Sequence, residues 1–130
     1  MPAAPAVLLS VAEHLREEWG AALEAAAVKA GQPIALHTAP GPHDPAAIDY
    51  MVYSHSGPVE DFAPYTRLKL IQNIWAGVEK VLTVPSLPPD VPFARMVEPG
   101  MTMGMQDFVV AHVMRYHAEI DTVIHGIGEG

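Results

Sequence analysis

Five short apolar runs recur along this chain, separated by stretches with helical or loop-like patterns. The runs cover residues 6–10, 33–38, 48–54, 68–74 and 91–97, although Pro92 leaves the start of the last one open. Their apolar residues are mostly consecutive rather than alternating, which is typical of parallel strands buried on both faces. We therefore predict a sheet of about five parallel strands.

Two longer stretches have the spacing of amphipathic helices. After the first run, Leu15, Trp19 and Leu23 recur at four-residue steps, and Gly31 is expected to end this helix. A long helix is predicted over residues 102–124, with its apolar side chains on one broad stripe. The alternation predicts an α/β fold, an open parallel sheet with helices on both faces and a long C-terminal helix.

Local signals add smaller elements to this fold. Ser10 and Glu13 fit a capping box at the start of the first helix. Short helices are expected over residues 58–65, where Pro58 suits the first helical position, and over residues 78–82. The 130 residues show no internal repeat and no domain boundary, so we expect a single domain over residues 1–130.

Composition excludes several classes of function. The formal net charge of −8 disfavours binding to nucleic acid, because phosphate backbones repel an acidic surface. The lack of cysteine excludes disulfides, thiolate metal sites and a thiol nucleophile. No apolar run is long enough to span a membrane, and the Ala- and Pro-rich start lacks the basic region of a signal peptide. We therefore expect a cytoplasmic protein.

Two loops that follow predicted strands are candidates for ligand binding, since open α/β sheets bind ligands beyond the carboxyl ends of their strands. Ala76 and Gly77 have little or no side chain, so an anion such as a small carboxylate could reach the backbone amides there. Gly77 could equally serve only to permit a tight turn. His55 follows the third predicted strand and is either a ligand-facing side chain or a loop residue without a functional role.

The same loops carry a family resemblance. Residues 68–79, LKLIQNIWAGVE, resemble the "LK…GAGVD" segment of the D-isomer-specific 2-hydroxyacid dehydrogenases, closest to their glyoxylate/hydroxypyruvate reductase branch. Residues 49–55 resemble the strand of that branch that ends in Trp-His, and residues 98–101 and 105–109 resemble its Gly-Met and Met-Gln-Glu-Tyr-Ala segments. The matches keep their order over roughly residues 5–121.

The resemblance implies a flavodoxin-like substrate-binding domain of a nicotinamide-dependent oxidoreductase that acts on a small 2-oxo or 2-hydroxy acid. It implies that the backbone amides of Ala76 and Gly77, with Val78 adjacent, hold the substrate carboxylate. His55, at the carboxyl end of its predicted strand, is the further candidate for a substrate-facing residue. The resemblance also implies that Met105 can face the nicotinamide of NAD(P) or the substrate, although a methionine at helical spacing also suits a core position.

Three residues depart from the pattern of the family. Glu79 stands where the motif has Asp, and Ser54 stands where the branch has Trp before its His. Trp75 occupies a position that is usually held by a smaller residue. Trp75 either fills the space that Ser54 leaves or is a core or interface aromatic residue.

The resemblance also implies a missing part. The Rossmann domain of the family, with its nicotinamide fingerprint and catalytic Arg, Glu and His, would follow the long helix, but the sequence ends at Gly130. Residues 126–130 supply only Gly-x-Gly-x-Gly, which is either part of a dinucleotide loop or a plain glycine-rich end. We therefore expect the 130-residue chain to bind no cofactor and to transfer no hydride by itself.

Other interpretations remain open at this point. The chain could be a non-catalytic binder of small carboxylates, or an oligomerisation module whose long helix pairs in a homodimer. A receiver domain is disfavoured, because no acidic cluster follows the first predicted strand. His117, Asp121 and His125 recur at four-residue steps, which would place metal-ligating side chains on one helical face or simply on a solvated one.

Overall fold

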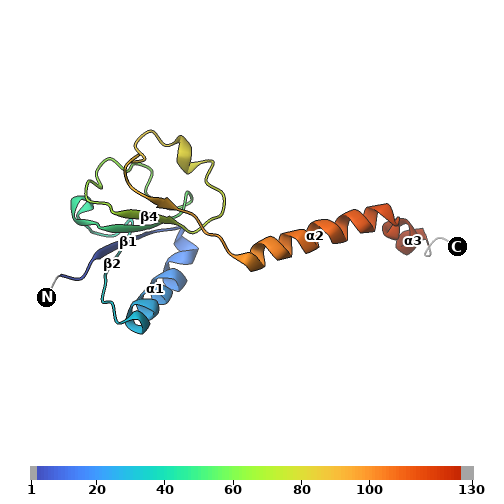
Figure 1. Cartoon of the computed structure of the whole chain (residues 1–130), viewed down its shortest axis with the longest axis horizontal. Coiled ribbons are helices and arrows are strands. Elements are labelled where there is room, and N and C mark those ends of the chain that lie inside the picture. Colours follow the sequence, from blue (N-terminus) through green and yellow to red (C-terminus); the bar gives the residue numbers. More distant parts are fainter. Residues whose placement is uncertain (1–2, 127–130) are drawn as a thin grey trace. The chain divides into compact units, whose positions relative to one another are not determined.

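The computed structural model describes residues 3–126, in which the chain divides into two compact units, Met1–Met96 and Val97–Gly130. The first unit contains a five-stranded sheet of order β2-β1-β3-β4-β5, and every described pairing is parallel (Figure 1). Its strands are β1 (Ala6–Ser10), β2 (Ala35–Thr38), β3 (Tyr50–Tyr53), β4 (Leu70–Asn73) and β5 (Phe93–Ala94). The predicted parallel sheet is confirmed.

The strands are shorter than the apolar runs that predicted them, most clearly at the edges of the sheet. β5 pairs with β4 only through Phe93 and Ala94, although the apolar run covers residues 91–97. Pro92 has no N–H group and contributes only its carbonyl oxygen, which accepts from the Ile71 N–H group at 3.0 Å. Because a proline at the strand entry cannot donate to β4, the strand begins only after it, at Phe93.

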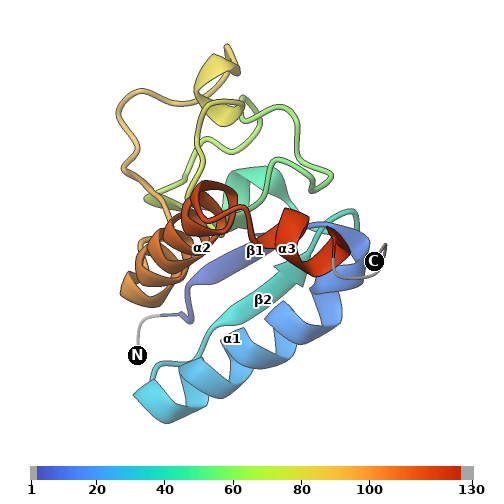
Figure 2. The same cartoon turned by 90° about the vertical axis from the view of Figure 1, so that its right-hand side faces the viewer.

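One face of the sheet is covered by α1 (Arg16–Ala30), which lies along β1 and β2 (Figure 2). Leu15, Trp19 and Leu23 pack against a buried cluster that includes Val7 and Leu9, as the helical spacing predicts. Gly31 ends the helix in the left-handed conformation with φ 63°, which glycine adopts without strain.

The opposite face is covered by loops and by the 3-10 helices η2 (Pro45–Ala47) and η3 (Val81–Thr83), of which η3 buries Val81 in the core. The predicted helix over residues 58–65 is wrong, because this stretch forms turns. Pro64 lacks an N–H group and disfavours helical backbone at the residue before it. Phe62 and Tyr65 are nevertheless buried in the core of this face.

The end of β1 is tied to the loop that follows β3. The predicted capping box is wrong, because the fully buried Ser10 Oγ accepts from the Val59 N–H group at 3.2 Å rather than from the helix. A Cβ atom on Gly57 would lie only 2.4 Å from the Ser10 carbonyl oxygen. Glycine is thus required for this close approach, which fixes the loop that carries His55.

The second unit consists of α2 (Pro99–His117) and α3 (Ile120–Gly126), so the predicted helix over 102–124 begins earlier and is interrupted. Glu98 caps α2, because its carboxylate accepts from the N–H groups of Gly100 at 2.8 Å and Met101 at 2.7 Å. Among residues 3–126, no helix combines the length and the apolar character that crossing a membrane requires.

The break between α2 and α3 changes the interpretation of the histidines. Glu119 has φ 51°, so the helical path stops there, and Arg115 Nε donates to the Asp121 carboxylate at 2.8 Å across the break. His117, Asp121 and His125 therefore do not share the face of one helix, contrary to the expectation. The glycine-rich segment beyond Gly126 lies outside the described residues.

Candidate active site at the carboxyl ends of β3 and β4

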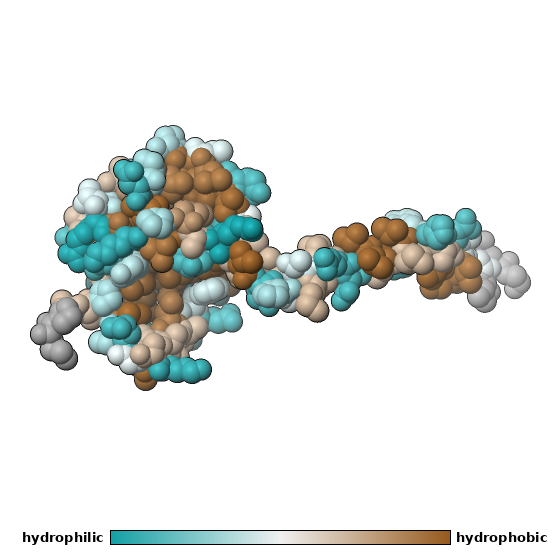
Figure 3. Space-filling view, viewed as in Figure 1, coloured by the Kyte–Doolittle hydropathy of each residue, from teal (hydrophilic) through white to brown (hydrophobic). Residues whose placement is uncertain are grey.

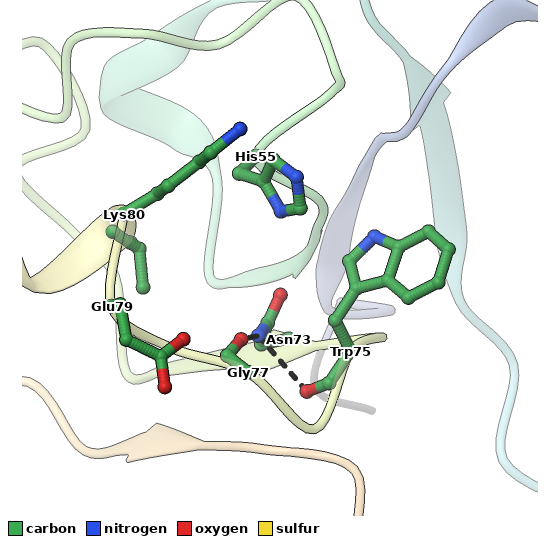
Figure 4. A pocket seen from close by; sticks show the side chains of 7 residues that line it. His55, Asn73, Trp75, Gly77, Glu79 and Lys80 are labelled. Carbon is green, nitrogen blue, oxygen red and sulfur yellow. Dashed lines mark hydrogen bonds between the residues drawn. The ribbon is translucent and has the colours of Figure 1, made fainter.

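A cavity of about 210 Å³ lies where β3 and β4 end (Figure 4). Its wall combines the second residue after β3, the last residue of β4, the turn that follows and the first residue of η3: His55, Asn73, Trp75, Gly77, Glu79, Lys80 and Val81. The carboxyl edge of an open parallel sheet is the usual place for a ligand. The cavity thus coincides with the two loops that the sequence singles out.

The carbonyl oxygens of the turn after β4 are all bound within the protein. The Asn73 side chain donates from Nδ2 to the carbonyl oxygens of Trp75 and Gly77, both at 3.0 Å. The Trp75 carbonyl also accepts from the Met96 N–H group at 3.2 Å, and the Ala76 carbonyl accepts from Arg95 Nη1 at 3.3 Å. These bonds fix the three peptide planes of the turn.

The N–H groups of the same turn are free. Within the part of the chain that the structure describes, those of Ala76, Gly77 and Val78 donate to no backbone or side-chain acceptor. The peptide bonds here are trans, so each N–H group points opposite to a carbonyl that is already bound. Three consecutive donors are therefore available to an anion.

The helix after the turn is too short to attract an anion by its dipole. The sequence places a helix over residues 78–82, but only the 3-10 helix η3 forms, at Val81–Thr83. A helix N-terminus therefore contributes little here, because the helix macrodipole is the sum of aligned peptides and η3 has only three residues. Any attraction of an anion must come from the free N–H groups and from nearby charged side chains.

Trp75 and His55 form one side of the cavity. The Trp75 indole donates from Nε1 to the Oγ atom of the fully buried Ser54 at 2.8 Å, and its ring centroid lies 6.1 Å from that of His55. Trp75 is 42% exposed, so it is not a core residue. The indole lies against Ser54, as the interpretation that Trp75 fills the space beside Ser54 requires.

Two charged side chains of opposite sign border the free N–H groups. A Cβ atom on Gly77 would lie 3.0 Å from Glu79 Oε2, so this carboxylate lies beside the turn. Lys80 lines the same cavity, and its side chain extends toward His55 (Figure 4). A bound anion would be attracted by Lys80 and repelled by Glu79.

The structure brings four of the five predicted site residues into the first unit. His55 and Gly77 line one cavity, and the half-buried Ala76 and Val78 belong to the same turn. Met105 lies on α2 in the second unit, where it is 61% exposed, and its role toward a cofactor stays a prediction.

Sequence reasoning missed Asn73 and Lys80. An amide at the end of an apolar strand is the one signal that could have identified Asn73, since a buried polar side chain must find partners.

The strongest charge cluster of the first unit lies at the other end of β3. Asp49 accepts from the Ala6 N–H group at 3.0 Å, from Arg67 Nη2 at 2.9 Å and from Lys69 Nζ at 3.0 Å. The hydrogen bond from Arg67, followed by those from Ala6 and Lys69, holds the pKa of Asp49 well below its usual range. This cluster stabilises the sheet far from the cavity.

Comparison with known proteins identifies relatives of this chain. No family model matches it. It is 36% identical over 69 residues to glyoxylate/hydroxypyruvate reductase A of Yersinia enterocolitica, covering 49% of this chain and 22% of the relative. It is also 36% identical over 86 residues to glyoxylate/hydroxypyruvate reductase A of Escherichia fergusonii, covering 62% of this chain and 26% of the relative.

Solved structures extend the similarity to nearly the whole chain. A D-isomer specific 2-hydroxyacid dehydrogenase from Xanthobacter autotrophicus Py2, in complex with NADPH and MES, matches with a TM-score of 0.77 and 29% identity over 98% of this chain and 40% of that one. A second structure described in the same terms from that organism matches with a TM-score of 0.58 and 28% identity. The chain spans about a quarter of the curated relatives and 40% of the solved ones.

Proposed function

We propose that this chain, which is related in sequence and fold to the D-isomer-specific 2-hydroxyacid dehydrogenases, is a substrate-binding domain of a glyoxylate/hydroxypyruvate reductase type. The free N–H groups of Ala76, Gly77 and Val78 at the end of β4 carry this proposal. They form a donor set for the carboxylate of a small 2-oxo or 2-hydroxy acid. His55, which lines the cavity beside this turn, is the residue that we assign to contact with the rest of the ligand.

The contribution of this chain to such a reaction is orientation. A carboxylate held by several backbone donors has a fixed direction, so the adjacent carbonyl carbon presents one face to a hydride donor. Because these donors are positioned by bonds to Asn73 and Arg95, they need little rearrangement when the ligand binds. Hydride transfer itself is the chemistry of the nicotinamide.

The described residues do not fit a nicotinamide dinucleotide. A dinucleotide site needs a glycine-rich turn that joins a strand to a long helix, whereas β1 leads to α1 through Val11 and Ala12. Met105 is the one residue proposed here to face a nicotinamide. Under the proposal, NAD(P) is held by polypeptide other than residues 3–126, and the chain alone transfers no hydride.

Calorimetric titration of the purified chain tests this function. Oxalate and glyoxylate should bind with dissociation constants in the millimolar range or below, whereas propionamide, which has no carboxylate, should not bind. Gly77→Val should weaken oxalate binding at least tenfold, because its side chain would project beside the free N–H groups. Equal binding of oxalate and propionamide would contradict the proposal, as would a robust rate of NADPH oxidation with glyoxylate.

A homodimer is the second part of the proposal, and the surface of α2 supports it. Phe108, Val109 and Val113 are 58%, 50% and 59% exposed, and apolar patches are visible along this unit (Figure 3). Such a stripe favours pairing with a partner helix. Sedimentation equilibrium should give a dimer that Val113→Asp converts to a monomer. A monomeric wild type would contradict this part.

We also propose that the protein is cytoplasmic.

A further inference from the structure

Asn73 is a buried polar residue at the last position of β4, directly before the turn with the free N–H groups. Ile71 on the same strand and Ile74, which directly follows it, are buried apolar residues. Asn73 is only 1% exposed, yet both bonds of its side chain go to the turn rather than to the sheet. Its polar group is therefore used for the conformation of the turn.

The orientation of the Asn73 amide follows from its partners. Both acceptors are carbonyl oxygens, of Trp75 and Gly77, so the end that faces them must be the NH₂ group. In a trans peptide the N–H group points opposite to the carbonyl of the preceding residue. Because both carbonyls point toward Asn73, the N–H groups of Ala76 and Val78 point away from it.

The other end of the amide is unsatisfied. Asn73 Oδ1 is buried and has no hydrogen-bond partner among the described residues. A buried unpaired acceptor lowers stability, so an apolar side chain would suit the core better at this position. The two donor bonds to the turn explain why a polar residue stands there.

We propose that Asn73 is a positioning residue for carboxylate binding: its side chain holds the carbonyls of Trp75 and Gly77 so that the N–H groups of Ala76 and Val78 point away from it and stay free to bind the carboxylate. This inference rests on the proposed function and adds to it the residue that orients the donors. Asn73 does not touch the ligand through its NH₂ group, because both donors of that group are already used. Its effect on binding therefore passes through the backbone.

Two substitutions at this position test the inference, with a third as control. Asn73→Asp keeps the shape but places a carboxylate against two carbonyl oxygens, and Asn73→Ala removes both donor bonds. Asp49→Asn is the control, because Asp49 is similarly buried and its carboxylate accepts hydrogen bonds from Ala6 and Arg67 at the other end of β3. All of these proteins are titrated with oxalate, and their amide spectra are recorded without ligand.

Both Asn73 variants should bind oxalate at least tenfold more weakly than the wild type. In the unliganded protein they should also shift the amide signals of Ala76 and Val78. A substitution that only lowered the stability of the fold would leave those signals in place. Asp49→Asn should lower the melting temperature and leave the oxalate affinity and those signals unchanged. The inference is overturned if the wild type binds oxalate and the Asn73 variants bind it equally well. A wild type that binds no oxalate instead removes the proposed function, and this inference with it.

Discussion

The two turns that follow β3 and β4 lie at the same edge of the sheet but use their backbones in opposite ways. After β3, two N–H groups are occupied: that of Ser56 donates to Ser54 Oγ at 3.2 Å, and that of Gly57 donates to the Ser54 carbonyl at 2.9 Å. After β4, the carbonyls of residues 75–77 are occupied and the N–H groups of residues 76–78 are free. Position at the carboxyl edge alone does not make an anion site; the direction of the peptides decides it.

The two turn glycines should differ most in their tolerance of substitution. Gly57→Ala should destabilise the protein by about 2–4 kcal/mol, because its Cβ would lie 2.4 Å from a backbone oxygen that cannot move away. Gly77→Ala should cost less than about 0.5 kcal/mol, since its Cβ meets only the flexible end of Glu79 at 3.0 Å. Urea unfolding of both variants measures the difference, and equal losses would contradict the comparison.

The far end of β3 should govern the response of the fold to acid. Because its pKa is lowered in the folded state, ionised Asp49 contributes stability above its ordinary pKa of 3.8, and this stability is lost as pH falls through the lower folded value. Asp49→Asn should therefore be less stable than the wild type at pH 7 and should lose less further stability between pH 5 and pH 2. Thermal unfolding across that range measures both, and parallel profiles would exclude the cluster as the cause.

The hydrogen bond between Trp75 and Ser54, which joins the two turns, should contribute less to the free energy of unfolding. Ser54→Ala removes the acceptor of the Trp75 indole and should cost about 1 kcal/mol, while Trp75→Phe should cost less because Ser54 keeps Ser56 as a partner. The emission of Trp75 should move to longer wavelength in Ser54→Ala as the indole becomes more exposed. A matched spectrum from Trp75→Phe identifies the background from Trp19, and unchanged emission would contradict the link.

The charged residues beside the β4 turn should have the smallest effects, and only on binding. Glu79→Gln should strengthen oxalate binding about two- to fivefold at low salt, because it removes a negative charge beside the N–H groups. Lys80→Gln should weaken binding by a similar factor. Both effects should shrink at high salt, and a salt-independent change would point to altered packing instead.

The sheet was predictable because buried parallel strands leave continuous apolar runs, and the place of the turn was predictable because Ala76 and Gly77 leave the backbone open. The role of Asn73 was not predictable, because it depends on the direction in which the peptide groups of residues 75–77 point in the folded chain. The helix expected to start at Pro58 did not form, because Pro64 disfavours helical backbone at the residue before it. The long C-terminal helix is interrupted at Glu119, where the backbone leaves the right-handed helical region.

One measurement tests the central claim most directly, a ¹H–¹⁵N correlation spectrum of the 130-residue chain during titration with oxalate. The account predicts that the amide protons of Ala76, Gly77 and Val78 move downfield together and saturate, because they become donors to a carboxylate, while the amides of Ser56 and Gly57 move little. Signals of the β4 turn that stay in place, or larger shifts in the β3 turn, would contradict it.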